Sequence, residues 1–183
     1  MVDMTVPEGQ PVVTAQRVTL RPLTTGDTGL LHLYCSDKRV ARMTRTIPHP
    51  YPPGAAEAFI KAALAPERKG LVWAIEARRD GRSELMGVIG LEPMDRGQCE
   101  IGYWVAPAFW NSGLATEAVG ALLSANPMGC ACAFGSVFQD NPTSARVLMK
   151  NGFDYIGDAE AFSVARGGIA PTWTYSKKLA QPT

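Results

Sequence analysis

The chain has 183 residues, 46% of them hydrophobic, and a formal net charge of +1. This length suits a single domain, 1–183, with a sizeable core. The near-neutral balance excludes a general electrostatic attraction to nucleic acid or to a membrane surface. No apolar run approaches the length of a membrane span, and the opening MVDMTVPEGQP has acidic residues and no apolar signal segment. We therefore expect a cytoplasmic protein with a loose leader over residues 1–14.

The four cysteines lack a zinc-like spacing with a histidine partner, and a chain of this size does not need disulfide bonds to fold. We expect reduced and mostly buried thiols and no metal site. The pair Cys130-Ala-Cys132 is the one pattern that hints at metal or redox chemistry.

The first half of the chain alternates between strand-like and helix-like patterns. We predict a strand at 17–23, helices at 27–35 and 37–44, a proline-rich loop at 47–54, a helix at 55–64, and strands at 71–77 and 85–91. Asp80-Gly81 is a hairpin signal between the last two strands.

The second half adds strands at 100–105, 131–138, 153–157 and 172–178, with a helix on each side of the strand at 131–138. Three consecutive strands joined by short turns indicate antiparallel pairing, and the strand–helix–strand arrangement over 100–138 indicates one parallel pair. The predicted fold class is α/β (α+β), a mixed central sheet with helices on both faces.

The stretch EIGYWVAPAFWNSGLATEAVG, residues 100–120, is a strand, a turn and a helix. Ile101, Tyr103 and Val105 share one face of the strand, and Pro107 ends it. The turn is Asn111-Ser112-Gly113, and the apolar face of the helix is Leu114, Ala118, Ala121, Leu122 and Ala125. The free N–H groups and dipole of a helix start can bind a pyrophosphate, whereas the bland alternative is a glycine that only turns the chain.

A second stretch, QDNPTSARVLMKNGF, covers residues 139–153. Asn141 fits an N-cap, Pro142 the first helical position, and Asn151-Gly152 a C-terminal stop. Together the two stretches resemble the GNAT superfamily of acetyl-CoA-dependent N-acetyltransferases, and most of all its ribosomal-protein N-terminal acetyltransferase branch. The resemblance covers roughly residues 16–179. It implies a mostly antiparallel sheet of about six to seven strands with a V-shaped splay between 100–105 and 131–138.

The resemblance also implies where acetyl-CoA binds, with backbone groups around Tyr103 and Val105 holding the pantetheine arm. The turn departs from the family: Trp110 replaces a polar residue, Asn111 a glycine and Ser112 a basic residue, but any of them still supplies a backbone N–H. The expected acetyl-CoA-binding residues are Tyr103, Trp104, Val105, Asn111, Ser112, Gly113, Leu114, Ala115, Thr116, Asn141 and Ser144.

Acetyl transfer to an amine needs a general base, and Glu100 is the candidate. It lies on an apolar strand and shares a face with Trp104, a setting that raises the pKa of a carboxyl. The alternative is a structural carboxylate that orders the loop before the strand or pairs with an arginine. His49 is the rival base because histidine titrates near neutral pH; a loop-packing role is the alternative there, and His32 is interpreted as structural.

The departing thiolate needs an acid. Many GNAT enzymes use a tyrosine where this chain has Leu148, whereas the branch with Asn-x-x-Ser at the helix start is thought to use the serine, which matches Asn141 and Ser144. The alternative for Ser144 is a plain helix cap. Asn141 is expected to cap the helix and touch the coenzyme.

The acceptor pocket is expected within residues 24–66. Tyr51 and Trp104 are candidate lining residues, whereas Phe59 and Trp73 are more typical of a core. Arg39, Arg42 and Arg45 fall three apart on the predicted helix; they could attract an acidic acceptor or a coenzyme phosphate, and a solvated face is the alternative.

The predicted function is transfer of an acetyl group from acetyl-CoA to a primary amine, a protein N-terminus or a small molecule, by direct attack in a ternary complex. The alternatives are a non-catalytic acyl-CoA-binding sensor or partner protein, and a structural protein that binds neither ligand. No nucleic acid, membrane or metal is expected as a partner, and the protein is expected to be a monomer or homodimer.

Overall fold

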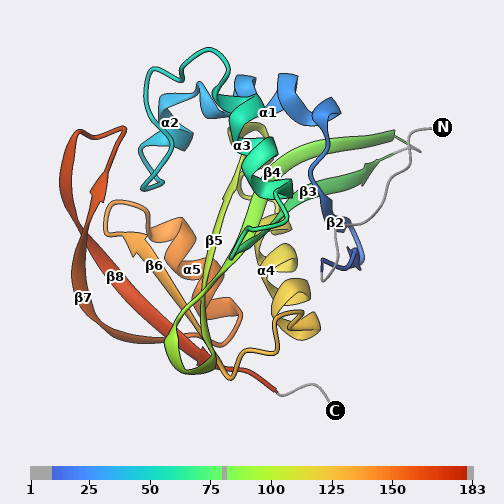
Figure 1. The fold of residues 1–183 in the computed structure, drawn as a ribbon. Helices are drawn as coiled ribbons and strands as arrows, with labels where there is room; N and C mark the ends of the chain where they lie inside the picture. Colours follow the sequence, from blue (N-terminus) through green and yellow to red (C-terminus); the bar gives the residue numbers. More distant parts are fainter. Residues whose placement is uncertain (1–9, 80–81, 181–183) are drawn as a thin grey trace.

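One open sheet of eight strands runs through the molecule in the order β1-β2-β3-β4-β5-β6-β8-β7 (Figure 1). The computed structural model describes residues 10–79 and 82–180. The strands are β1 (Val13–Thr14), β2 (Val18–Pro22), β3 (Leu71–Arg79), β4 (Arg82–Pro93), β5 (Gln98–Val105), β6 (Cys132–Phe138), β7 (Asp154–Ser163) and β8 (Gly168–Lys178). All neighbours pair antiparallel except β5 and β6. The predicted mixed sheet is confirmed; the Asp80-Gly81 turn lies outside the described residues.

Helices cover both faces of this sheet (Figure 1). They are α1 (Thr28–Cys35), α2 (Lys38–Ala41), α3 (Ala55–Leu64), α4 (Leu114–Ala125) and α5 (Pro142–Lys150). The apolar residues of α4 and α5 join one core cluster, and those of α1 and α3 join a second one. Side chains of β5 alternate between the two clusters: Ile101 and Val105 pack in the first, and Trp104 packs against the second.

The parallel pair separates partway along its length. The register of β5 and β6 runs from Gln98 opposite Cys132 to Ile101 opposite Gly135 and then ends. Beyond that point, residues 102–105 still pair with β4, and residues 136–138 still pair with β8. The predicted splay is therefore confirmed, and it leaves one edge of each strand free to bind a ligand.

The segment after α1 differs from the prediction. α2 ends at Ala41 rather than Thr44, and the chain then leaves the helix, with the Thr44 hydroxyl donating to the Ala41 carbonyl at 2.8 Å. Arg39, Arg42 and Arg45 therefore do not form one solvated helix face. Each pairs with a different carboxylate, that of Asp37, Asp140 and Glu100 respectively.

Three further features differ from the prediction. The leader is packed from Gln10 onward: β1 pairs with β2, and the Gln10 side chain donates to the Val72 carbonyl at 2.6 Å. The inward face of α4 includes Val119 and Leu123, whereas Ala125 is exposed. The hairpin of β7 and β8 extends beyond the predicted strands at 153–157 and 172–178. Its outer part is largely exposed, so the sequence there lacks the apolar alternation that would indicate a strand.

The described cysteines carry free thiols; Cys35, Cys99 and Cys130 are buried and Cys132 is half-buried. Burial and a hydrogen bond with Cys130 raise the pKa of the Cys99 thiol to about 12. Within residues 10–79 and 82–180, no three His, Cys, Asp or Glu side chains are grouped to hold a metal ion. Nor does any helix in these ranges have the length and apolarity to cross a membrane.

Candidate active site

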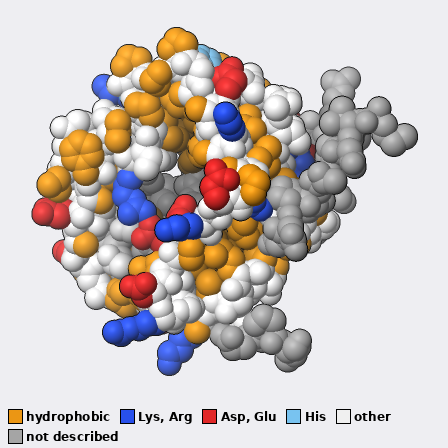
Figure 2. Space-filling model, viewed as in Figure 1, with side chains coloured by type: hydrophobic (Ala, Val, Ile, Leu, Met, Phe, Trp, Pro, Cys, Tyr) orange, Lys and Arg blue, Asp and Glu red, His pale blue; other side chains and the backbone are white. Residues whose placement is uncertain are grey.

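A cavity of about 910 Å³ lies where β5 and β6 diverge. Figure 2 shows a hollow in the middle of this face, with acidic and basic side chains beside it. Its walls come from the segment after α2, from β4, β5 and β6, from the start of α5 and from β8. The predicted site residues in these walls are Glu100, Tyr103, Trp104, Val105, Asn111, Ala115, Asn141 and Ser144. Ser112, Gly113, Leu114 and Thr116 lie outside this lining, at the adjoining turn and helix start.

The turn before α4 has left-handed backbone at two positions. The φ angles are 57° at Asn111 and 77° at Gly113. Glycine adopts this region freely and asparagine is among the residues that tolerate it, which explains why Asn111 can stand in for a glycine. Gly113 is the N-cap, so the unpaired N–H groups of the helix start lie at this end of the cavity. The Leu114 side chain is buried in the core, so only its backbone is available to a ligand.

Two arginines from elsewhere in the chain lie beside this turn. Arg17 donates from Nη1 to the Ser112 carbonyl at 2.9 Å and pairs with Glu117 in the first turn of α4 at 3.3 Å. The guanidinium of Arg39 lies 5.6 Å from the ring centroid of Trp110. The sequence showed the turn to lack its usual basic residue but gave no signal that two ion-paired arginines lie beside it, because their approach depends on how β2 and α2 pack against the turn.

Glu100 lies on the cavity wall in an ion pair with Arg45. Its side chain is 24% exposed, so the carboxylate is accessible from the cavity despite the pair. Glu92 of β4 is its cross-strand neighbour and also lines the cavity. The predicted alternative of a pair with an arginine is therefore realised, and it does not take the carboxylate away from the cavity.

Ser144 does not cap α5; Asn141 does. The Asn141 Oδ1 accepts from the Ser144 backbone N–H at 3.3 Å. The Ser144 hydroxyl instead donates to the Tyr103 hydroxyl at 3.0 Å, and the Tyr103 hydroxyl donates to the Ser144 carbonyl at 2.8 Å. Burial raises the pKa of Tyr103 well above its usual range, so the phenol keeps its proton at neutral pH. Sequence reasoning assigned Tyr103 a backbone role only and missed this hydroxyl pair.

Comparison with known proteins agrees with this geometry. The family described as Acetyltransferase (GNAT) domain matches residues 17–154. The chain belongs to the GNAT acetyltransferase family.

Relatives of this GNAT chain carry different names. The uncharacterized N-acetyltransferase YoaA of Bacillus subtilis (strain 168) is 35% identical over 119 residues, covering 63% of this chain and 66% of that protein, just under two thirds of its length. The Microcin C7 self immunity acetyltransferase MccE, in complex with acetyl-CoA and AMP, has a TM-score of 0.77 at 18% identity, covering 90% of this chain and 94% of MccE. RimL, a ribosomal L7/L12 alpha-N-protein acetyltransferase in complex with coenzyme A, has a TM-score of 0.77 at 14% identity over 92% and 98% of the two chains. The resemblance to the GNAT superfamily, with a ribosomal-protein enzyme among its neighbours, is confirmed.

The aromatic residues considered for an acceptor pocket lie in different places in this GNAT chain. Tyr51 and Trp104 line the cavity, and so does Phe59, which was expected in the core. Trp73 is fully buried in the core, as predicted. The rival base His49 is exposed and is not part of the cavity wall.

Two further wall residues bear on ligand binding. Leu148, where many GNAT enzymes have a tyrosine, presents an apolar surface to the cavity. The Thr172 side chain of β8 is 3% exposed, and its Oγ1 has no hydrogen-bond partner within the described part of the chain. A buried hydroxyl without a partner costs free energy, so this wall is suited to a ligand that supplies a polar atom.

Proposed function

We propose that this protein is an acetyl-CoA-dependent N-acetyltransferase that acts on a primary amine by direct attack in a ternary complex. The observation that supports this most strongly is that Asn111 of the turn, the Glu100 carboxylate and the Ser144 hydroxyl meet at one cavity. Acetyl-CoA in the MccE complex and coenzyme A in the RimL complex support the choice of co-substrate.

In this proposal the diphosphate of acetyl-CoA binds at the start of α4. The backbone N–H groups of residues 111–116 and the helix dipole favour an anion there. Arg17 and Arg39 lie beside the turn, and each would have to share its carboxylate partner, Glu117 or Asp37, to contact the anion. The pantetheine arm follows the free edge of β5 at Tyr103 and Trp104. The Val105 carbonyl is already an acceptor for the Trp110 indole N–H at 2.7 Å, so it stabilises the turn.

Glu100 removes a proton from the acceptor ammonium, directly or through water. The neutral nitrogen then attacks the thioester carbon, which forms the C–N bond. For this to occur the amine must share the carboxylate with Arg45 or displace it. Removing the acceptor's charge and fixing its approach are the two contributions expected of this residue.

Ser144 donates a proton to sulfur as the C–S bond breaks. In the structure the Ser144 O–H donates to the Tyr103 hydroxyl at 3.0 Å, so it must turn from Tyr103 to the sulfur for this step, and Tyr103 is a positioning residue for the Ser144 oxygen. Overall the nitrogen loses two protons, sulfur gains one, and one is released to solvent. The proton balance therefore needs no metal or redox partner.

Thiol release from acetyl-CoA in the presence of a panel of primary amines and N-terminal peptides tests the proposal, with mass spectrometry of the acetylated product. We expect release that depends on an acceptor, and an acetylated amine in equal amount. The alternative of a non-catalytic acyl-CoA sensor is motivated by the Arg45 pair at Glu100. It predicts binding of acetyl-CoA and no product with any acceptor. Cytoplasmic location and the choice between monomer and homodimer stay predictions from the sequence.

A further inference from the structure

The face of β4 and β5 that lines the cavity carries three cross-strand pairs in a row. They are Glu92 with Glu100, Gly90 with Gly102, and Val88 with Trp104. Directly opposite residues of an antiparallel pair lie on one face of a sheet, and residues two apart on a strand share that face. The row therefore runs from two carboxylates, across two glycines, to an apolar pair. We call this row, together with the cavity residues of α3 and of the segment 42–45, the acceptor end.

The two glycines leave the middle of the row without side chains. Gly102 is exposed although β5 lies inside the sheet, between β4 and β6. A Cβ built on Gly102 would meet nothing within 4 Å, whereas a Cβ on Gly90 would lie 3.1 Å from the Leu71 carbonyl oxygen. Glycine weakens the interior of a strand and often marks a place where a ligand approaches the backbone closely. The pair thus forms a floor, open above Gly102, on which a ligand can lie.

The carboxylate end of the row is suited to an ammonium group. Glu92 and Glu100 lie directly opposite each other on neighbouring strands, and like charges in that position destabilise a sheet. Arg45 pairs with Glu100, so two carboxylates and one guanidinium leave one negative charge at this end of the row. A cationic acceptor would neutralise that charge beside the proposed base.

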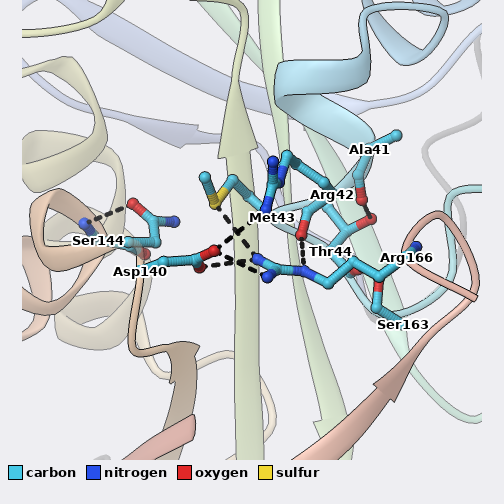
Figure 3. A network of polar contacts seen from close by, with 9 residues as sticks. Ala41, Arg42, Met43, Thr44, Asp140, Ser144, Ser163 and Arg166 are labelled. Atoms are coloured by element: carbon cyan, nitrogen blue, oxygen red, sulfur yellow. Dashed lines mark hydrogen bonds and ion pairs between the residues drawn. The ribbon is translucent and has the colours of Figure 1, made fainter. Parts of the chain in front are cut away.

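Asp140 also lines the cavity, but arginines already neutralise its carboxylate. Figure 3 shows the guanidinium of Arg166, from the hairpin turn between β7 and β8, directed at Asp140. Nη1 and Nη2 of Arg166 each donate to one Asp140 oxygen at 2.8 Å, and Arg42 adds a second cation at 3.3 Å. A bidentate pair of this kind is among the stronger ionic contacts. The ammonium of the acceptor is therefore assigned to the Glu92 and Glu100 pair.

The other end of the row is apolar. Phe59 of α3 lines the same cavity, is 37% exposed and belongs to neither core cluster of the described residues, whereas its neighbours Ala56 and Ile60 are buried. The cavity residues from the loop at 46–51, from α3 and from β3 are all uncharged. An aromatic side chain that the core does not bury can contact a ligand at little cost to stability.

We propose that the acceptor is a primary amine that carries an apolar group, with Phe59 and Gly102 as specificity-determining residues. This inference rests on the proposed acetyltransferase function. The ammonium lies at the carboxylate pair, and the apolar group extends over the glycine floor toward Trp104 and Phe59. A strand rises about 3.4 Å per residue, so the glycines lie about 7 Å and Trp104 about 14 Å along the row from the carboxylates. A hydroxyl or a second ammonium on the extended group would lose hydration beside uncharged walls, which costs free energy.

The test uses three amines that differ only at the far end of the chain: heptylamine, 6-aminohexan-1-ol and 1,6-diaminohexane, which end in a methyl, a hydroxyl and an ammonium group. We expect the wild type to favour heptylamine over the alcohol by about 10- to 100-fold in kcat/KM, as a hydrophobic pocket does against a hydroxyl isostere. The diamine should be poorer than heptylamine as well. In Phe59→Gln the preference for heptylamine over the alcohol should fall about fivefold, because apolar contact area is lost and a polar group is added. Intrinsic amine reactivity cancels, because the quantity compared is the change in this ratio between variants. Lys61→Gln, on an exposed position of α3 outside the cavity wall, is the matched control and should keep the wild-type ratio.

Gly102→Ala tests the floor separately. The added methyl group has open space in the structure, so the variant should fold, with a thermal midpoint equal to or above that of the wild type. It stands where the body of the acceptor lies, so kcat/KM for heptylamine should fall about tenfold, mainly through KM. Acetyl-CoA affinity should not change, because the methyl group lies on the face of β5 and not on its free edge. Gly168→Ala in β8, whose added Cβ also meets nothing within 4 Å and which lies outside the cavity wall, should behave as the wild type.

Several results would overturn the inference while leaving the acetyltransferase intact. One is a wild type that acetylates the alcohol as well as heptylamine, and another is a preference for the diamine, which would assign a second cation to the row. Wild-type selectivity in Phe59→Gln together with wild-type KM in Gly102→Ala would place the acceptor elsewhere. Product from other amines but not from heptylamine would do the same. No product from any amine would instead remove the proposed function, and this substrate class with it.

Discussion

The two ends of the cavity are built in different ways. At the donor end, the turn and the start of α4 are set by residues within a few positions of each other, such as the left-handed Asn111 and Gly113. At the acceptor end, the wall depends on contacts between residues far apart in sequence: 98 positions separate Arg42 from Asp140, and 124 separate Arg166 from the Arg42 carbonyl.

Because the two ends are built differently, they should control different properties. A local backbone shape can bind a phosphate whatever the side chains are, so the donor end tolerates Asn and Ser where the family often has Gly and a basic residue. A wall held by ion pairs and carbonyl contacts can change with single side chains, so the acceptor end is where specificity can vary. Variants at the donor end should alter acetyl-CoA binding, and variants at the acceptor end should alter the choice of amine.

The largest effect is expected where the two ends meet, at Glu100. Glu100→Gln removes the proton acceptor and leaves the Arg45 cation facing the incoming ammonium. We expect kcat/KM for the amine to fall about 1,000-fold, within the range for loss of a general base, with acetyl-CoA affinity nearly unchanged. Steady-state kinetics and calorimetry measure the two quantities. Asp95→Asn, an exposed carboxylate outside the cavity, is the control; an equal loss there would mean that overall charge, not the base, matters.

Ser144→Ala should have the next largest effect. It removes the hydroxyl that donates to Tyr103 while keeping the Asn141 cap, which uses only the Ser144 backbone. We expect kcat to fall about 100-fold, as for the loss of a general acid, with little change in stability or in acetyl-CoA affinity. Single-turnover thiol release measures the chemical step. Ser124→Ala, an exposed hydroxyl on α4, should behave as the wild type. Wild-type kcat in Ser144→Ala would leave protonation of sulfur to water.

Gly113→Ala probes the donor end alone. The φ of 77° disfavours any side chain, and an added Cβ would lie 3.2 Å from Nη2 of Arg17. A left-handed residue other than glycine costs about 1–2 kcal/mol, so we expect lower thermal stability and acetyl-CoA affinity weaker by about tenfold. The choice between amine acceptors should not change. Gly29→Ala in α1 is the control, because its Cβ meets nothing within 4 Å; it should be neutral or stabilising by about 0.5–1 kcal/mol.

The smallest effect concerns the pH dependence of the acceptor end. The hydrogen bonds from Arg166 lower the pKa of the Asp140 carboxyl. A carboxyl whose pKa is lower in the folded state contributes stability above its unfolded pKa of about 3.9, and loses it as pH falls through the folded value. The difference in unfolding free energy between wild type and Arg166→Gln should therefore be constant from pH 5 to 8 and shrink only in more acidic solution. Denaturant titrations at several pH values measure this difference. A difference that vanishes by pH 6 would contradict the bidentate pair of Arg166 with Asp140.

Much of the fold could be predicted because its signals are local. Alternation on β5, the cap and stop residues of α5, and the glycine before α4 each need only neighbouring residues. β1 was missed because two residues give no period, and the end of α2 because Thr44 and the hairpin turn, not helix propensity, decide where the chain goes.

The residues of the candidate site also divide into those that the sequence could predict and those that it could not. Asn141, Ser144 and Glu100 could be proposed from sequence because their spacing within a motif carries the information. Three contacts could not be predicted from sequence, because each depends on two elements meeting in space. They are the hydrogen bond of the Tyr103 hydroxyl, the contact of Arg17 with the turn, and the ion pair of Arg166 with Asp140. Arg17 and Arg39 come to the turn through tertiary contacts, which a linear pattern does not contain.

Binding of acetyl-CoA is tested most directly by a calorimetric titration into the wild-type protein. We expect saturable binding at one site, because the turn and the free edge of β5, with the arginines beside them, form one continuous donor end. Absence of binding would contradict both the enzyme and the sensor, and it would reduce the turn at Gly113 to a structural joint.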